Sequence, residues 1–83
     1  MVQVKLTLEA PVAEATVNDI TTALRNFDSQ VRMTLRNQTE LNYELLLPAP
    51  SDGQYEAVGQ LCKNWINEPN PVVLAYSTML TGP

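Results

Sequence analysis

The side chains that could do chemistry in this chain are its carboxylates, its single thiol and a few cations. No histidine occurs among the 83 residues, so the commonest general base, proton shuttle and metal ligand at neutral pH is missing. A Ser–His or Cys–His nucleophile and a histidine phosphorelay are therefore excluded. The carboxylates are scattered along the chain. Glu9 and Glu14, on either side of Pro11, come nearest to a general acid–base pair, and nothing else in the sequence supports that role.

Cys62 is the only cysteine. It lies between Val58 and Trp65 on the apolar side of a predicted helix, far from a helix N-terminus that would stabilise a thiolate. We expect a buried, inert thiol. A lone cysteine also excludes an intramolecular disulfide and a C-x-x-C metal motif. The sequence thus predicts no cofactor, no metal site and no catalytic residue, and we expect the protein not to be an enzyme.

The composition narrows the class of partner. Apolar residues make up 45% of the chain and the net charge is −4, which is typical of a globular domain. A negative balance argues against binding to nucleic acid or to an anionic membrane. There is no apolar run of 18 residues and no signal-peptide pattern at the N-terminus. We expect a single cytoplasmic domain, residues 1–83.

Periodicity predicts four strands and two helices. Apolar and polar residues alternate in 2–9, 30–36 and 40–47, which is the pattern of strands, and 71–80 predicts a fourth strand whose two faces are both largely apolar. Spacings of three and four predict a helix over 17–27, with Thr16 as its N-cap, and another over 52–66, with Ser51 and Gln54 as a capping box.

The element order β-α-β-β-α-β predicts an α+β fold, the ferredoxin-like open-faced sandwich. We expect a mainly antiparallel four-stranded sheet with strand order 4-1-3-2, in which only the central strands 1 and 3 run parallel. Both helices should cover one face and leave the other open. Many unrelated functions share this topology, so it carries little functional information by itself.

The two middle strands should form a hairpin around Asn37–Thr39. If the numbers of paired residues sum to 76, the apolar pairs on the core side are Leu35–Leu41 and Met33–Tyr43. The charged pairs Arg36–Glu40 and Arg32–Glu44 then lie on the open face, where each is worth a few tenths of a kcal/mol.

The open face should be polar and free of aromatic residues. Lys5, Arg32 and Arg36 form a cationic strip interleaved with Glu40 and Glu44. An RNA-recognition sheet would place aromatic platforms here, so the pattern argues against RNA binding.

The last strand differs from the others, because no charged residue occurs from Val72 to Pro83. In the expected order it is an edge strand, and natural edges are usually protected by charge, proline or bulges. We expect Leu74 to point into the core and Val73, Ala75, Ser77 and Met79 to lie on the open face. On this reading Leu74→Lys should unfold the domain, whereas Val73→Lys or Ala75→Lys should only weaken association.

The leading hypothesis is a small non-enzymatic interaction module. It would dock on a protein partner, or on a second copy, through the open face and strand 72–80. The expected contact residues are Val73, Ala75, Ser77, Met79, Lys5, Arg32, Arg36 and Leu46. The alternative without a partner is that sheet twist and the C-terminal tail shield the edge of strand 72–80. A second hypothesis is an ACT-like ligand-sensing regulatory domain, which shares the topology and would bind a small molecule near Glu9–Thr16 or Pro48–Gly53.

Overall fold

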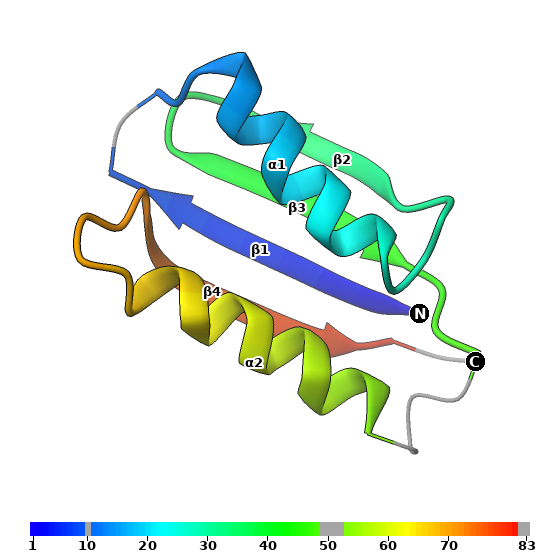
Figure 1. Ribbon diagram of the computed structural model, residues 1–83. Helices are drawn as coiled ribbons and strands as arrows, with labels where there is room; N and C mark the ends of the chain where they lie inside the picture. The colour runs from blue at the N-terminus through cyan, green and yellow to red at the C-terminus, as the bar shows by residue number, and fades with distance from the viewer. Residues whose placement is uncertain (10, 49–52, 82–83) are drawn as a thin grey trace.

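The computed structural model describes residues 1–9, 11–48 and 53–81. Its elements are β1 (Val2–Leu8), α1 (Glu14–Arg25), β2 (Arg32–Arg36), β3 (Glu40–Leu45), α2 (Gln54–Ile66) and β4 (Val73–Leu80). Both helices lie on the same face of the sheet, with α1 over β2 and β3 and α2 over β4 (Figure 1). No element of the described residues covers the opposite face, which we call the open face. The predicted element order is confirmed.

The sheet has the order β2-β3-β1-β4, which is the predicted order read from the other edge. Every neighbouring pair is antiparallel, including β1 with β3. The expectation of a parallel central pair was therefore wrong. The crossover through α1 gives β1 and β2 the same direction, and the tight hairpin then reverses β3 relative to both.

β1 forms the centre of the core. Its even-numbered residues are buried against the helices, and its odd-numbered residues point to the open face. It bonds to β3 on one side and to β4 on the other. The core side of the fold is completed by buried residues from the rest of the chain: Val17, Ile20, Leu24, Leu41, Tyr43, Leu45, Leu47, Val58, Cys62 and Val73.

β2 contains a register shift that the alternation did not predict. Arg32 faces Glu44 and Met33 faces Tyr43, as expected, but Leu35 then faces Asn42 and Arg36 faces Leu41. Thr34 is the extra residue of a β-bulge, which displaces every later side chain of the strand by one position. Leu35 therefore lies on the open face, 40% exposed, and Arg36 on the helix side. The predicted Leu35–Leu41 and Arg36–Glu40 pairs do not form.

β4 contains a second bulge. Thr7 faces Ala75, but Leu8 faces Val73, so Leu74 is the extra residue. Val73 is fully buried beside Leu8, whereas Leu74 is 51% exposed. The expected facing of these two residues, and the outcomes expected for Val73→Lys and Leu74→Lys, were wrong. From Ala75 onward the predicted alternation holds, with Ser77 opposite Lys5 and Met79 opposite Gln3.

The helices begin and end at slightly different residues from those predicted. α1 begins at Glu14, after an Ala13 N-cap that makes no side-chain cap, and Thr16 lies in its first turn. Glu14 suits this position because a carboxylate is favourable at a helix N-terminus. α2 follows Gly53, whose φ of 91° lies in the left-handed region that glycine tolerates best. The predicted capping residue Ser51 lies outside the described residues.

Candidate functional site

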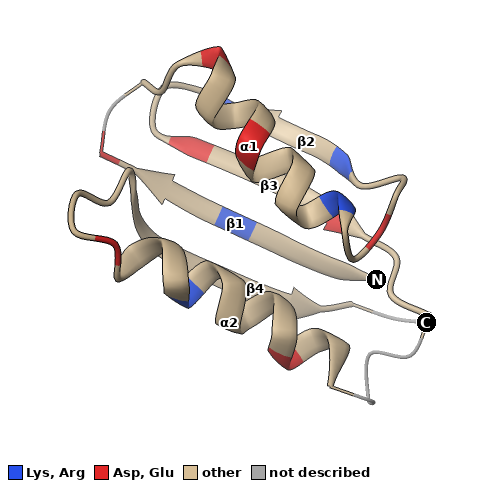
Figure 2. Ribbon diagram, viewed as in Figure 1, with Lys and Arg blue, Asp and Glu red and all other residues tan. Residues whose placement is uncertain are grey.

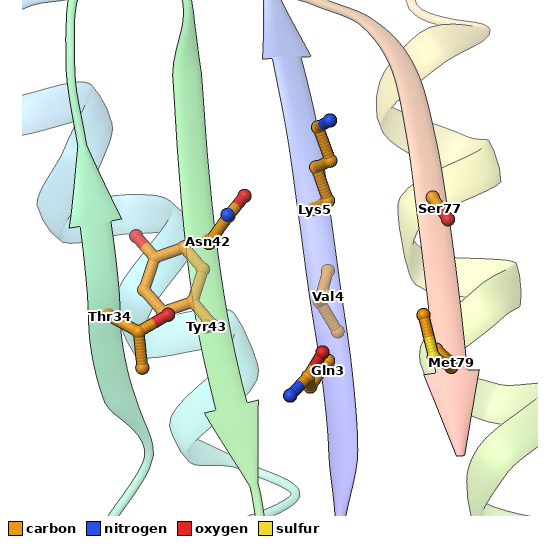
Figure 3. A pocket seen from close by; sticks show the side chains of 8 residues that line it. All are labelled: Gln3, Val4, Lys5, Thr34, Asn42, Tyr43, Ser77 and Met79. Atoms are coloured by element: carbon orange, nitrogen blue, oxygen red, sulfur yellow. The ribbon is translucent and has the colours of Figure 1, made fainter. Parts of the chain in front are cut away.

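The open face is the candidate functional site, and all four strands contribute to it. β1 provides Gln3, Lys5 and Thr7, and β3 provides Glu40, Asn42 and Glu44, according to the cross-strand register. Figure 3 shows the centre of this face, where Gln3, Lys5, Thr34, Asn42, Ser77 and Met79 surround a shallow depression of about 180 Å³. The floor of the depression is the sheet itself, so a partner would meet a broad, nearly flat surface.

The charges on this face neutralise one another. Lys5 Nζ lies 3.5 Å from Glu40 Oε1, and Arg32 Nη2 lies 3.7 Å from Glu44 Oε2. The predicted Arg32–Glu44 pair is thus confirmed. Both pairs are partly solvated, and pairs of this kind contribute about 0.2–1 kcal/mol each. Their main consequence is that the open face is close to neutral, although the whole chain carries a net charge of −4.

Arg36 does not belong to the open face. Its guanidinium donates to both carboxylate oxygens of Glu14 at the start of α1, at 3.2 and 2.5 Å. The hydrogen bonds and the charge of Arg36 lower the pKa of Glu14, and those of Glu14 raise the pKa of Arg36. The expected cationic strip is therefore reduced to Lys5 and Arg32, and Arg36 instead fastens the edge strand β2 to a helix.

Asn42 occupies the middle of the face and has an unsatisfied acceptor. Its Oδ1 atom is buried and accepts no hydrogen bond from the described part of the chain. A buried acceptor without a donor costs about 1–3 kcal/mol. The backbone of Asn42 pairs with Leu35 on one side and with Lys5 on the other. Because this atom has almost no exposed surface, a donor from outside the chain would reach it only after the Asn42 side chain turned toward the depression.

Apolar side chains surround the polar centre. Met79 is 55% exposed and Leu46 is 65% exposed. Leu46 follows β3 and lies near Arg32 and Glu44, and its N–H donates to Asp28 Oδ2 at 2.9 Å. Of the eight expected contact residues, the structure brings Lys5, Arg32, Ala75, Ser77, Met79 and Leu46 to this side of the sheet. It places Arg36 on the helix side and Val73 in the core.

The outer edge of β4 is partly occupied. The backbones of Met1 and Thr81 exchange hydrogen bonds of 2.8 and 2.7 Å, so alternation along the strand turns the C=O of Thr78 away from β1. The Tyr55 hydroxyl of α2 donates to this carbonyl at 3.0 Å and accepts from Thr78 Oγ1 at 3.1 Å. Figure 2 shows that β4 carries no charged residue along its length. Tyr55 and the Leu74 bulge protect this edge where charge does not.

Cys62 is buried on α2, as its spacing indicated. Burial raises the pKa of its thiol to about 11, which keeps it protonated and unreactive at neutral pH. Among residues 1–9, 11–48 and 53–81, no three His, Cys, Asp or Glu side chains are grouped so that they could hold a metal ion.

The sequence did not identify Thr34, Leu74 or Tyr55 as features of this surface. Thr34 lies between Arg32 and Arg36 in the alternation and was recoverable from it, Leu74 is exposed because it is the inserted residue of a bulge, and Tyr55 read as an ordinary core residue of its helix. Asn42 was recoverable in part, since the alternation of β3 places it on the open face. Its missing donor is visible only in three dimensions.

Neither helix among the described residues is long and apolar enough to cross a membrane. Comparison with known proteins adds no relative: no protein-family model matches this chain, and no curated protein or solved structure matches it.

Proposed function

We propose that this chain is a small non-enzymatic interaction module with a ferredoxin-like fold, which docks on a protein through its open face. The observation that carries the proposal is the surface made by Lys5, Asn42, Ser77 and Met79. It is uncovered by the described elements, almost neutral, and contains an Asn42 acceptor that receives no hydrogen bond from the described residues. Protein interfaces commonly combine a desolvated centre with polar contacts at the rim, and about one hydrogen bond forms per 100–200 Å².

The face is a better docking surface than the strand edge that the sequence favoured. Strand addition needs a row of free backbone groups on a regular edge. The Leu74 bulge interrupts that row, and the Tyr55 hydroxyl occupies the carbonyl of Thr78. Bulges of this kind are a common protection against edge-to-edge pairing. The uncharged strand β4 therefore contributes side chains such as Ala75, Ser77 and Met79, rather than its backbone.

The proposal includes the absence of catalysis and a reducing, cytoplasmic location. The chain has no histidine, and its only thiol is held protonated by burial. A single buried cysteine is compatible with a reducing compartment, where disulfides are rare.

A pair of charge-matched variants tests the docking proposal. Ser77→Lys adds a cation at the centre of the open face, and Thr22→Lys adds the same charge to the exposed side of α1. Tagged wild type and both variants are expressed in the native host, and bound proteins are quantified by mass spectrometry. We expect a protein that wild type and Thr22→Lys retain and that Ser77→Lys loses at least tenfold.

Circular dichroism must show that both variants are folded. If every protein retained by the wild type were retained equally by a folded Ser77→Lys variant, the open face would not be the docking surface and the proposal would fail.

Two hollows in the structure also support the alternative, an ACT-like ligand-sensing domain. Two hollows of about 290 and 230 Å³ meet at Pro11 and Val12, in the connection between β1 and α1 where a ligand was expected. The other expected segment, Pro48–Gly53, lies mostly outside the described residues. A thermal-shift screen with amino acids and nucleotides would separate the two functions, because a ligand bound here would raise the melting temperature of wild type and of Ser77→Lys alike.

A further inference from the structure

We propose that the partner of the open face is a second copy of this chain, packed face to face about a twofold axis that runs along the strands between β1 and β3. This inference rests on the proposed function and names its partner. It would form a two-sheet sandwich in which the helices are the outer layers and the polar faces meet in the middle.

Charge favours a second copy on this face over one elsewhere. Two chains that each carry −4 repel one another. The open face has two cations and two carboxylates in two salt bridges, Lys5–Glu40 and Arg32–Glu44. Copies that meet through this face bring together balanced charges, whereas the charge that makes each chain acidic remains on the outside.

The cross-strand register determines which residues would meet. A twofold axis along the strands between β1 and β3 lays β1 over the partner's β3 at the same height. Gln3, Lys5 and Thr7 of β1 are Cα partners of Glu44, Asn42 and Glu40 within one chain. Across the axis, Gln3 therefore lies over Glu44 of the partner subunit, Lys5 over the partner's Asn42 and Thr7 over the partner's Glu40. The row on β1 consists of side chains that can donate, and the row on β3 of side chains that accept.

The central contact of this arrangement is Lys5 over the partner's Asn42. Lys5 carries three donors and no acceptor. Asn42 Oδ1 receives no hydrogen bond within the described chain, and a turn of the Asn42 side chain toward the depression would bring it to the partner's ammonium group. The twofold axis creates the contact twice. Figure 3 shows Lys5 and Asn42 on neighbouring strands at the same level of the face, as the register requires.

The other in-plane axis, perpendicular to the strands, is excluded by charge. It would turn each strand over its own copy, so that Lys5 faced the partner's Lys5 and Glu40 faced the partner's Glu44. Like charges placed opposite one another oppose association.

The size of the face is sufficient for a weak dimer. The two longer dimensions of the fold are 34 and 23 Å, and a surface of that extent approaches the ~800 Å² that each partner gives to a typical stable interface. Much of the surface is polar, so we expect a dissociation constant in the range of about 10–100 μM rather than a permanent dimer.

Sedimentation velocity over about 5–500 μM tests the inference. We expect the mean mass to rise with concentration from the 9.2 kDa of one chain toward twice that value. Asn42→Lys should raise the dissociation constant at least tenfold, because it places two ammonium groups over each other at each central contact.

Adding Lys5→Asn to Asn42→Lys should restore the dimer, because the lysine and the asparagine then face each other again with their positions exchanged. Lys63→Glu, which changes a charge on α2, should leave the dissociation constant unchanged. The melting temperature of each variant shows that it is folded.

Three results would overturn the inference: a monomer at every concentration, a dimer that Asn42→Lys does not weaken, or a double variant that stays as weak as Asn42→Lys. A strict monomer would leave the proposed function standing, because the capture comparison of Ser77→Lys with Thr22→Lys tests docking on other proteins independently. If that capture comparison failed while the exchanged pair restored the dimer, the face would serve self-association alone.

Discussion

β1 and β4 are neighbouring strands that contribute to the same core, yet they follow their sequence patterns very differently. Every even residue of β1 from Val2 to Leu8 is buried without interruption. In β4 only Val73 is fully buried, and Leu74 and Leu80 are both more than half exposed. β1 is held by hydrogen bonds on both sides, whereas β4 has a neighbour on one side only.

The difference shows where side-chain alternation is a reliable guide. A strand with two neighbours cannot accept an extra residue without disturbing two ladders at once, so its alternation is preserved. An edge strand disturbs one ladder only, and bulges are accordingly more frequent there. Both edges of this sheet, β2 and β4, contain a bulge, and neither central strand does within the described residues.

The largest expected effect comes from introducing lysine at either of two adjacent β4 residues, one buried and one exposed. Val73→Lys would bury an ammonium group with no partner beside Leu8, which should cost several kcal/mol and unfold most of the protein. Leu74→Lys should change stability by less than about 1 kcal/mol, since the side chain already lies in solvent. Thermal and urea unfolding measure both. Equal destabilisation by the two variants would show that the bulge is misplaced.

The same Leu→Ala substitution should have a smaller effect than Val73→Lys, and its cost in stability should differ between the central strand β1 and the edge strand β4. Leu6→Ala in β1 removes a fully buried side chain and should cost about 2–5 kcal/mol. Leu80→Ala in β4 removes a side chain that is 54% exposed and should cost less than about 1 kcal/mol. Urea denaturation at 25 °C gives both values. A Leu80→Ala cost as large as that of Leu6→Ala would mean that the end of β4 is covered.

The smallest effect concerns the attachment of the β2 edge to α1. Because Arg36 lowers the pKa of Glu14, this pair should stabilise the fold above the ordinary glutamate pKa and lose that contribution as the pH falls through the lowered value. Wild type should therefore melt slightly above Glu14→Gln at pH 7, and the two melting temperatures should converge once the pH falls below the lowered pKa of Glu14. A gap that persisted at low pH would indicate that Glu14 acts without its charge.

Much of the fold was predictable because its central features are periodic. The alternation in β1 and β3 and the helical spacing of Val17, Ile20 and Leu24 identified the elements, and the chain order then gave the sheet order. The relative direction of β1 and β3 also follows from this topology. The prediction that they are parallel was wrong, because the hairpin reverses β3 relative to β2, and β2 has the same direction as β1.

The candidate site was predictable only in part. Lys5, Arg32, Ala75, Ser77 and Met79 were placed on the open face by alternation, and the structure agrees. Val73 was misplaced because it precedes the inserted residue Leu74, and Arg36 because it follows the inserted residue Thr34. A single inserted residue leaves no compositional trace. Tyr55 and the orphan acceptor of Asn42 depend on contacts between residues far apart in the chain.

The central place of β1 also affects how the protein must be made. Its two pairing partners, β3 and β4, both follow it in the chain, and the last of them ends at Leu80. At ~5–20 residues per second, the ribosome needs roughly 4–14 s after completing β1 before β4 has been synthesised. During that interval the apolar side of β1 has no complete sheet to join. The most protected strand of the finished fold is therefore the one that waits longest for its pairing partners while the chain is being translated.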